Sequence, residues 1–449
     1  MNRSWQRFLP TAIQKKLEPY QHLRKAIANT GWLMGDQVFR LAAGLLVGVW
    51  LARYLGPEQQ GLISYASAFT SLFAIIATLG LDEIVIREIV REPESSDEIT
   101  GTAFFMKLAG GVITLIVTVI AITLTRPENH TVLLLTSILA TGTIFQSFNV
   151  IDCWFQSQVA ARYTVMARNA SFVLIVLAKA LLIFLKAPLV AFAFAGVAEI
   201  ALAAGGLVLV YHRLGHRISF WRFKWSLAKS LLKYSWPLIL ADALITVYMR
   251  IDQIMLGSMV GDKAVGLYSV VVRISEAWYF IPGAIVASVY PVLIKLREED
   301  REAYLQQLQR LYTFLVWLAL AVAVPFTFIS TFLVTALFGQ QYSAAGNVLS
   351  VHIWTAVFIF YGIGKSVFIQ CENMQKFCLV CTAAGAILNI VLNIYLIPRY
   401  DIMGAAIATL CAQIAASTII PAMYKPDRIN VRMFLKSFFF VSFFRKKSW

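Results

Sequence analysis

Twelve long apolar stretches dominate this sequence, and each is close to or above the roughly 20 residues that a helix needs to cross hydrocarbon. The stretches are continuous rather than alternating between apolar and polar residues, so they predict helices and not the strands of a membrane barrel. They cover residues 30–53, 59–86, 102–125, 131–155, 162–185, 187–211, 234–257, 264–294, 308–338, 344–370, 377–398 and 402–424.

Composition supports a membrane protein and excludes other classes. Hydrophobic residues make up 59% of the 449 positions and charged residues only 14%, whereas a soluble domain has about a quarter charged residues. These values exclude a soluble globular enzyme, a disordered chain and a disulfide scaffold. The net charge is nevertheless +15, from 39 Lys and Arg against 24 Asp and Glu.

The basic residues are concentrated in three polar segments. The leader 1–28, the connection 212–233 and the tail 425–449 hold 6, 6 and 7 Lys and Arg. With twelve spans, all three segments lie on one side of the membrane, and cytoplasmic loops are the ones rich in Lys and Arg. We therefore predict a multi-pass membrane protein with both termini in the cytoplasm.

The connection 212–233 divides the chain into two lobes of six spans, 29–211 and 234–424. A short repeat supports duplication, because Gly56-x4-Gly61-Leu follows the first span and Gly261-x4-Gly266-Leu follows the seventh. Six spans is an even number, so the lobes have the same orientation. The predicted fold is all-α and integral to the membrane, with a pseudo-two-fold axis along the membrane normal and a site between the lobes.

Ionisable residues inside the spans are costly to bury and indicate function. Three arginines come from spans at corresponding places in the two lobes, and guanidinium groups bind phosphate oxygens bidentately. These residues predict a cavity for an anionic, phosphate-bearing substrate. The candidate substrate-binding residues are Arg40, Arg250, Arg273, Lys179 and Lys365.

Five acidic residues in the spans are candidates for binding a coupling H⁺ or Na⁺. An alternative reading is structural, because Asp36 and Arg40 are four residues apart and Arg273 and Glu276 are three apart, as in helix ion pairs. The ion-coupling candidates are Asp36, Glu199, Asp242, Asp252 and Glu276.

Signatures of enzymes and metal sites are missing from the sequence. The chain has no Gly-x4-Gly-Lys-Ser/Thr loop and no His-Glu-x2-His motif. Cys378-x2-Cys381 has metal-ligand spacing but no second pair, so we expect no bound metal and no resident cofactor. The basic, aromatic connection 212–233 predicts an interfacial segment on anionic membrane lipids rather than a nucleic-acid site.

Two motifs give the sequence a family likeness. The run Ala-Arg-Tyr-Leu-Gly-Pro-Glu-Gln-Gln-Gly occupies residues 52–61, and Arg-Ile-Asp-Gln-Ile-Met-Leu-Gly occupies 250–257. With Leu-Asn at 388–389 and Ile-Pro-Arg-Tyr at 397–400, they resemble the Wzx-type polysaccharide biosynthesis flippases of the MOP exporter superfamily. The resemblance covers nearly the whole chain.

The resemblance implies two six-helix lobes around a V-shaped cavity. It implies alternating-access flipping of an undecaprenyl-pyrophosphate-linked oligosaccharide for O-antigen (lipopolysaccharide) or exopolysaccharide assembly, coupled to an ion gradient. Related lipid II flippases line their cavity with arginines on the first and eighth spans, and Arg40 and Arg273 lie in comparable places. Its implied partners are the lipid-linked oligosaccharide, a polysaccharide polymerase and the chain-length machinery.

Three other functions compete with this interpretation. An ion-coupled multidrug exporter of the same superfamily predicts an acidic cavity for cationic substrates, which the arginines argue against. A membrane polymerase or ligase is expected to need a sizeable outer loop, whereas the predicted outer connections are short. A non-transporting scaffold for polymer assembly is the third. We predict a transporter and not an enzyme.

Overall fold

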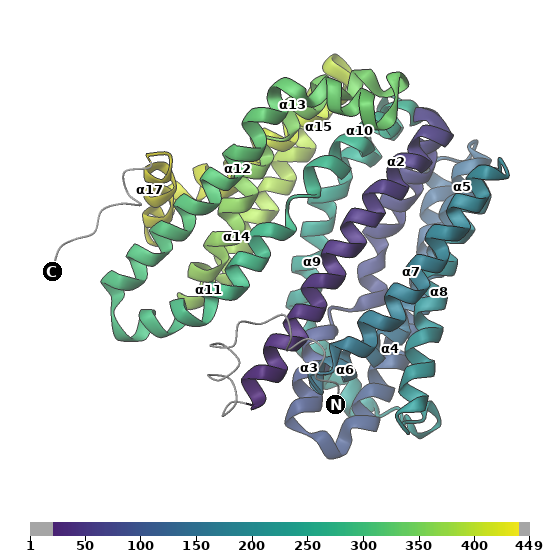
Figure 1. The fold of residues 1–449 in the computed structure, drawn as a ribbon, viewed down its shortest axis with the longest axis vertical. Coiled ribbons are helices and arrows are strands. Elements are labelled where there is room, and N and C mark those ends of the chain that lie inside the picture. The colour runs from purple at the N-terminus through teal and green to yellow at the C-terminus, as the bar shows by residue number, and fades with distance from the viewer. Residues whose placement is uncertain (1–20, 440–449) are drawn as a thin grey trace, which may run out of the picture.

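The computed structural model describes residues 21–439, and in that part of the chain every regular element is a helix. Figure 1 shows two groups of helices that converge at one end, where α2, α10, α13 and α15 meet. The groups diverge toward the opposite end, near α3 and α6 on one side and α11 on the other. We call the converging end the junction end.

The first group is the N-lobe. Its longest helix, α2, covers two predicted spans that bend apart at Gly56, which has a φ of 73°. Glycine adopts this left-handed conformation without the steric cost that a Cβ imposes. The N-lobe helices are α2 (Gln21–Thr78), α3 (Asp82–Arg91), α4 (Ser96–Thr125), α5 (His130–Phe145), α6 (Val150–Ser157), α7 (Ala161–Phe184) and α8 (Leu189–Arg213), with short turns η2 (Pro93–Ser95), η3 (Gln146–Asn149) and η4 (Ile218–Phe220).

The second group is the C-lobe. Its helix α15 also joins two predicted spans, with a break at Asp401. The C-lobe helices are α9 (Trp225–Met259), α10 (Asp262–Glu276), α11 (Phe280–Glu299), α12 (Arg301–Phe338), α13 (Ser343–His352), α14 (Thr355–Cys371), α15 (Gln375–Ile414), α16 (Ile420–Met423) and α17 (Arg428–Ser437), with short turns η5 (Gln340–Tyr342), η6 (Ala415–Ile419) and η7 (Lys425–Asp427).

The helices account for all twelve predicted spans. Eight described helices are long and apolar enough to cross a membrane, or nine if α13 and α14, which are bent by 46°, form one span. The count is lower than twelve because α2 and α15 each contain two predicted spans, and because α9, which carries Asp242, Arg250 and Asp252 inside its apolar stretch, is not among the eight. Within the predicted tail, α17 packs its buried Met433 and Phe434 into the C-lobe, and the leader falls mostly outside the described residues.

The two copies of the glycine repeat meet at the junction end. A Cβ on Gly61 would lie 1.7 Å from the backbone oxygen of Asp262, and one on Gly266 would lie 1.7 Å from that of Pro57. Both positions therefore require glycine, because no side chain fits between α2 and α10. The repeat that suggested a duplicated fold is thus also the contact between the two lobes.

Polar side chains surround this glycine crossing. Arg126 of the N-lobe forms an ion pair with Asp262 of the C-lobe at 2.6 Å, and its guanidinium lies 4.0 Å from the centroid of the Tyr65 ring. Arg53 Nε donates to the backbone oxygen of Leu337 at 2.5 Å. These contacts join the lobes at the junction end.

The glycine crossing predicts a stability effect. Gly266→Ala should lower the free energy of unfolding by about 1–3 kcal/mol, because an added methyl group forces the two backbones apart. Thermal unfolding of the purified protein in detergent measures this. Gly205→Ala is the matched control, since nothing lies within 4 Å of its added Cβ. Equal melting temperatures for the two variants would contradict the close approach of α2 and α10.

Candidate functional site

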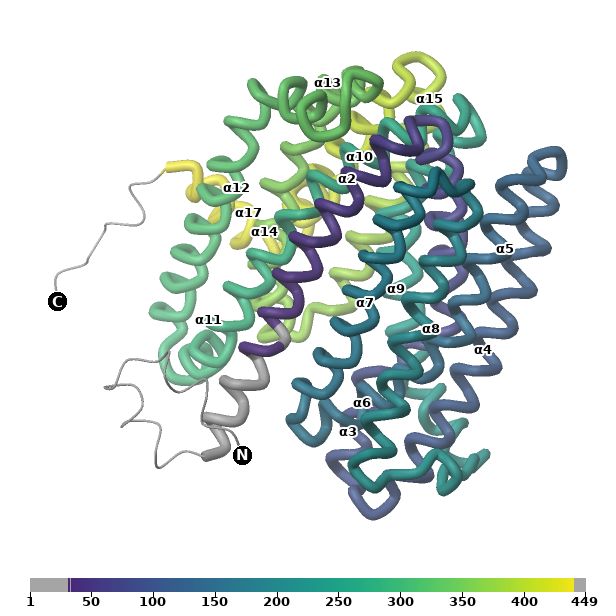
Figure 2. The backbone as a smooth tube through the Cα atoms, turned by 45° about the vertical axis from the view of Figure 1, so that its right-hand side comes forward, coloured from purple at the N-terminus to yellow at the C-terminus, as the bar shows by residue number. Residues whose placement is uncertain are grey.

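A cavity of about 730 Å³ lies between the two lobes. In Figure 2, α2 runs along this boundary, between α7 of the N-lobe and α10 of the C-lobe, and both helices contact α2. The described residues of the wall include four cations and one carboxylate. The cations are Arg40, Lys179, Arg250 and Arg273, and the carboxylate is Glu276.

The N-lobe cations share one carboxylate. Arg40 Nη2 lies 3.2 Å from Glu199 Oε1, and Lys179 Nζ lies 3.5 Å from Glu199 Oε2. The Arg40 guanidinium also lies 4.9 Å from the centroid of the Phe172 ring. The helix-neighbour pair of Asp36 and Arg40 is therefore not formed, because Arg40 pairs with α8 instead of its own helix. One unit of positive charge remains.

The C-lobe side of the cavity also pairs between helices. Arg250 Nη2 lies 3.5 Å from Glu276 Oε2. Glu276 therefore balances the charge of Arg250 on α9 and not that of Arg273 on its own helix. Among the described residues Arg273 has no ion-pair partner, and its buried Nη1 has no hydrogen-bond partner. Arg273 is thus an uncompensated cation in the cavity wall.

Gly48 makes room for this cation. A Cβ on Gly48 would lie 2.2 Å from Arg273 Nη1, whereas nothing lies within 4 Å of a Cβ on Gly44. Gly44 and Gly48, four residues apart on α2, therefore have different surroundings. Gly48 receives the tip of an arginine from the opposite lobe, and Gly44 contacts no neighbouring helix in this way.

The balance of charge favours an anion. The four cations of the wall are offset by Glu199 and Glu276, so the described residues leave an excess of two positive charges. Guanidinium groups bind phosphate oxygens through short, charge-assisted and often bidentate hydrogen bonds. The geometry suits a ligand that carries about two negative charges.

An uncharged polar region also lines the cavity, and the sequence analysis did not single it out. Gln60, Ser64, Ser67 and Ser71 face the cavity from α2, and their spacing of four, three and four residues places them on one face of the helix. The helical spacing of these polar residues within an apolar stretch was the sequence signal that could have predicted a polar face on this span.

Five predicted site residues lie outside the cavity wall: Glu199, which pairs with Arg40 and Lys179 of the wall, Asp252, Lys365, Asp36 and Asp242. Lys365 is buried and forms an ion pair with Asp427 at 2.7 Å, which links α14 to the segment before α17. Asp36 and Asp242 lie on α2 and α9 but do not line the cavity. The structure therefore groups four of the five predicted cations and separates Lys365 from them.

Asp252 lies in a buried network rather than in the cavity wall. Its carboxylate, 4% exposed, accepts hydrogen bonds from Tyr268 Oη at 2.9 Å, from Asn393 Nδ2 at 2.6 Å and from the Thr409 hydroxyl. Asn393 also donates to Asn389 Oδ1 at 3.1 Å. No lysine or arginine of the described chain pairs with Asp252. Its negative charge is balanced only by neutral donors.

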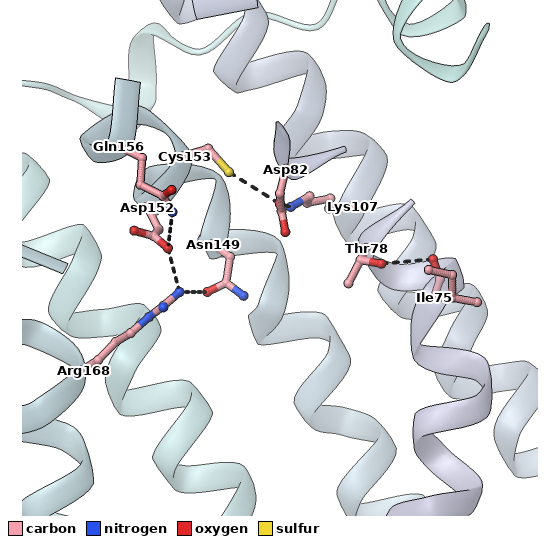
Figure 3. A network of polar contacts seen from close by, with 9 residues as sticks. All are labelled: Ile75, Thr78, Asp82, Lys107, Asn149, Asp152, Cys153, Gln156 and Arg168. Carbon is pink, nitrogen blue, oxygen red and sulfur yellow. Dashed lines mark hydrogen bonds and ion pairs between the residues drawn. The ribbon is translucent and has the colours of Figure 1, made fainter. Parts of the chain in front are cut away.

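The N-lobe contains a separate polar cluster that joins α3, α4, α6 and α7 (Figure 3). Lys107, only 2% exposed, pairs with Asp82, and Cys153 Sγ donates to Asp82 Oδ1 at 3.4 Å. Arg168 pairs with Asp152 at 2.9 Å. The cluster neutralises the buried Lys107 and the half-buried Arg168. The described residues include no group of three or more His, Cys, Asp or Glu that could hold a metal.

Comparison with protein families gives two matches. The model described as "Polysaccharide biosynthesis protein" matches residues 26–297, and the MatE model matches residues 237–395. A similar curated protein is the probable flippase AglR of Haloferax volcanii, 31% identical over 178 residues, which are 38% of this chain and 37% of AglR. The matched region spans less than half the length of the curated relatives.

Two solved structures share the fold. An inward-facing multidrug resistance MATE family transporter of the MOP superfamily has a TM-score of 0.73 at 18% identity, covering 88% of this chain and 95% of that one. Lipid II flippase MurJ in an inward closed conformation has a TM-score of 0.68 at 15% identity, covering 92% and 91%. The predicted two-lobe, twelve-span membrane fold is confirmed.

The position of Gly48 generates a prediction about anion binding. Gly48→Ala should leave the protein folded, because the crowded atom is the flexible tip of Arg273, but it should displace the guanidinium. The affinity for inorganic pyrophosphate should fall about tenfold, equivalent to about 1.4 kcal/mol, as measured by isothermal titration calorimetry. Gly44→Ala, one turn away, should bind like the wild type. Equal affinities of the two variants for pyrophosphate would contradict the claim that Gly48 makes room for Arg273 in the anion-binding position.

Proposed function

The chain belongs to the polysaccharide biosynthesis protein family, and from this premise we propose that it is a flippase for a lipid-linked oligosaccharide. The proposed substrate is an undecaprenyl-pyrophosphate-linked oligosaccharide. The protein moves it from the cytoplasmic to the outer leaflet of a bacterial inner membrane for O-antigen (lipopolysaccharide) or exopolysaccharide assembly. The observation that carries the proposal is the cationic cavity between the lobes.

The charge of the cavity is matched to this substrate. A pyrophosphate that links a lipid to a sugar carries about two negative charges. The four cations of the described wall, together with Glu276 and with Glu199 that pairs with two of them, leave an excess of two positive charges. A sugar-pyrophosphate group cannot cross hydrocarbon unaided, because its charges lose their hydration. Arg273, which has no carboxylate partner, supplies a free guanidinium for the phosphate oxygens, while the prenyl chain stays in lipid.

The shape supports alternating access. The lobes are held together at the junction end by the Gly61 and Gly266 crossing and by the ion pair of Arg126 with Asp262. We assign this end to the outer side of the membrane, since the basic connection 212–233 lies at the opposite end. The termini are then cytoplasmic, and release to the outer leaflet requires these contacts to separate.

The buried Asp252 network is the proposed coupling site. Asp252, Asn389, Asn393 and Thr409 place carboxylate, amide and hydroxyl oxygens around one point between α9 and α15. A proton on Asp252, or a Na⁺ held by these oxygens, would neutralise a carboxylate that has no cationic partner. Occupancy of the site then changes how α9, α10 and α15 pack.

A multidrug exporter is the second candidate, and the MatE match favours it. Such a protein needs a cavity that attracts cationic compounds. The wall described here has the opposite balance, because two of its four cations remain uncompensated. We therefore place the flippase first, and we propose the polysaccharide polymerase and chain-length machinery as the partners that receive its product.

The cavity arginines provide the first test. Arg273→Ala and Arg40→Ala should each reduce flipping of undecaprenyl-pyrophosphate-linked sugar in proteoliposomes by about 100-fold or more, as expected for loss of a charge-assisted contact of about 3 kcal/mol. Arg301→Ala, an exposed position at the start of α12, is the matched control. Near-normal flipping by both cavity variants, or no flipping of any prenyl-pyrophosphate sugar by the wild type, would refute the proposal.

Asp252→Asn tests the coupling site. The variant keeps the shape of the side chain but removes its charge, so flipping should no longer respond to a Na⁺ or pH gradient across proteoliposomes. Binding of inorganic pyrophosphate should stay within about twofold of wild type, because Asp252 lies outside the cavity wall. Asp97→Asn, an exposed position, is the control. A gradient response that persists in Asp252→Asn would exclude this residue.

A further inference from the structure

We propose that Gln60, Ser64, Gln253 and Ser269 form a separate subsite of the cavity, which binds the hydroxyl groups of a neutral sugar. The inference rests on the proposed function, because it concerns the sugar that is joined to the pyrophosphate. It goes beyond that function by assigning the part of the headgroup that the cations do not bind. These four residues line the same cavity from both lobes.

Gln60 provides the strongest observation. Its side chain is in the cavity wall but only 2% exposed, and its Nε2 donates to Ser64 Oγ at 3.0 Å. Its Oε1 has no hydrogen-bond partner among the residues that the structure describes. A buried amide oxygen without a donor is unusual, since nearly all buried polar atoms are paired. A sugar hydroxyl is a donor of the right kind for this oxygen.

The opposite lobe presents a matching set of groups. Gln253 on α9 is 6% exposed and lines the cavity, and within the described chain its amide forms no side-chain hydrogen bond. The Ser269 hydroxyl on α10 donates to the backbone oxygen of Gly266 at 2.8 Å, so its oxygen is left as an acceptor. The subsite therefore offers amide and hydroxyl groups from both sides.

The position of these groups relative to the cations supports the assignment. Gln253 follows Arg250 by three residues on α9, and Ser269 precedes Arg273 by four on α10. Because α9 ends and α10 begins at the junction end, both polar residues lie one turn closer to that end than the arginines. One helical turn rises about 5.4 Å, which is close to the width of one pyranose ring.

The one-turn offset between the arginines and the polar residues sets the orientation of the substrate headgroup. With the pyrophosphate against Arg250 and Arg273, the attached sugar lies toward the junction end, at Gln253 and Ser269. The prenyl chain then leaves in the opposite direction. Amide and hydroxyl groups exchange hydrogen bonds with sugar hydroxyls without changing the net charge, so the subsite selects a neutral sugar rather than an acidic one.

The test compares two lipids that differ only in the sugar. Undecaprenyl pyrophosphate and undecaprenyl-pyrophosphate-linked N-acetylglucosamine are titrated against the full-length protein in nanodiscs. Gln60→Leu and Gln253→Leu should each weaken binding of the sugar-bearing lipid about tenfold, while the sugar-free lipid changes by less than about twofold. Gln306→Leu, at an exposed position on α12, should bind both lipids like the wild type.

Folding is measured on the same samples. Gln60→Leu removes both the buried oxygen without a partner and the hydrogen bond to Ser64, two effects of opposite sign, so its melting temperature should stay close to that of the wild type. Equal weakening of both lipids, or unchanged binding of the sugar-bearing lipid, would overturn the subsite while the flippase proposal stands. A wild-type protein that binds neither lipid would overturn the proposed function, and this inference with it.

Discussion

The contact of α2 with α10 at Gly61 and Gly266 determines how the rest of the molecule is arranged. Two helices that touch backbone to backbone cannot slide or separate slightly without losing their contact, since no flexible side chain fills a gap between them. The crossing closes one end of the lobe boundary and leaves space for a cavity further along the same helices. It also brings Gly48 of α2 to the tip of Arg273 on α10, so the same pair of helices forms the junction and part of the cationic cavity wall.

The charges of the cavity are balanced between helices rather than along them. Glu199 of α8 is shared by Arg40 and Lys179, and Glu276 of α10 pairs with Arg250 of α9. Each pair therefore depends on the packing of neighbouring helices, which alternating access would alter. In the proposed function, an incoming phosphate would compete with these carboxylates for Arg40 and Arg250, whereas Arg273 has no carboxylate partner among the described residues.

Much of this arrangement was predictable because membrane spans are long and strongly apolar. The all-α, two-lobe fold followed from span length and count, and four of the five predicted cations line one cavity. The exceptions share a cause. Lys365 lies inside a predicted span, as Lys179 does, but it pairs with Asp427, more than sixty residues away along the chain, which no local spacing reveals. The alternative reading of Asp36–Arg40 and Arg273–Glu276 as helix ion pairs is wrong for the same reason, because Arg40 and Glu276 pair with other helices.

By itself, the sequence determined the class of protein, the number of spans and the duplication, because these depend on hydropathy and on residues close together along the chain. Only the tertiary structure decided which charges are neutralised, why Gly48 and Gly61 must lack side chains, and where Gln60 and Gln253 face a common space. Those properties depend on distances of a few ångströms between helices that are far apart in sequence. Periodicity places a residue on a face of its own helix but does not identify the neighbour that the face meets.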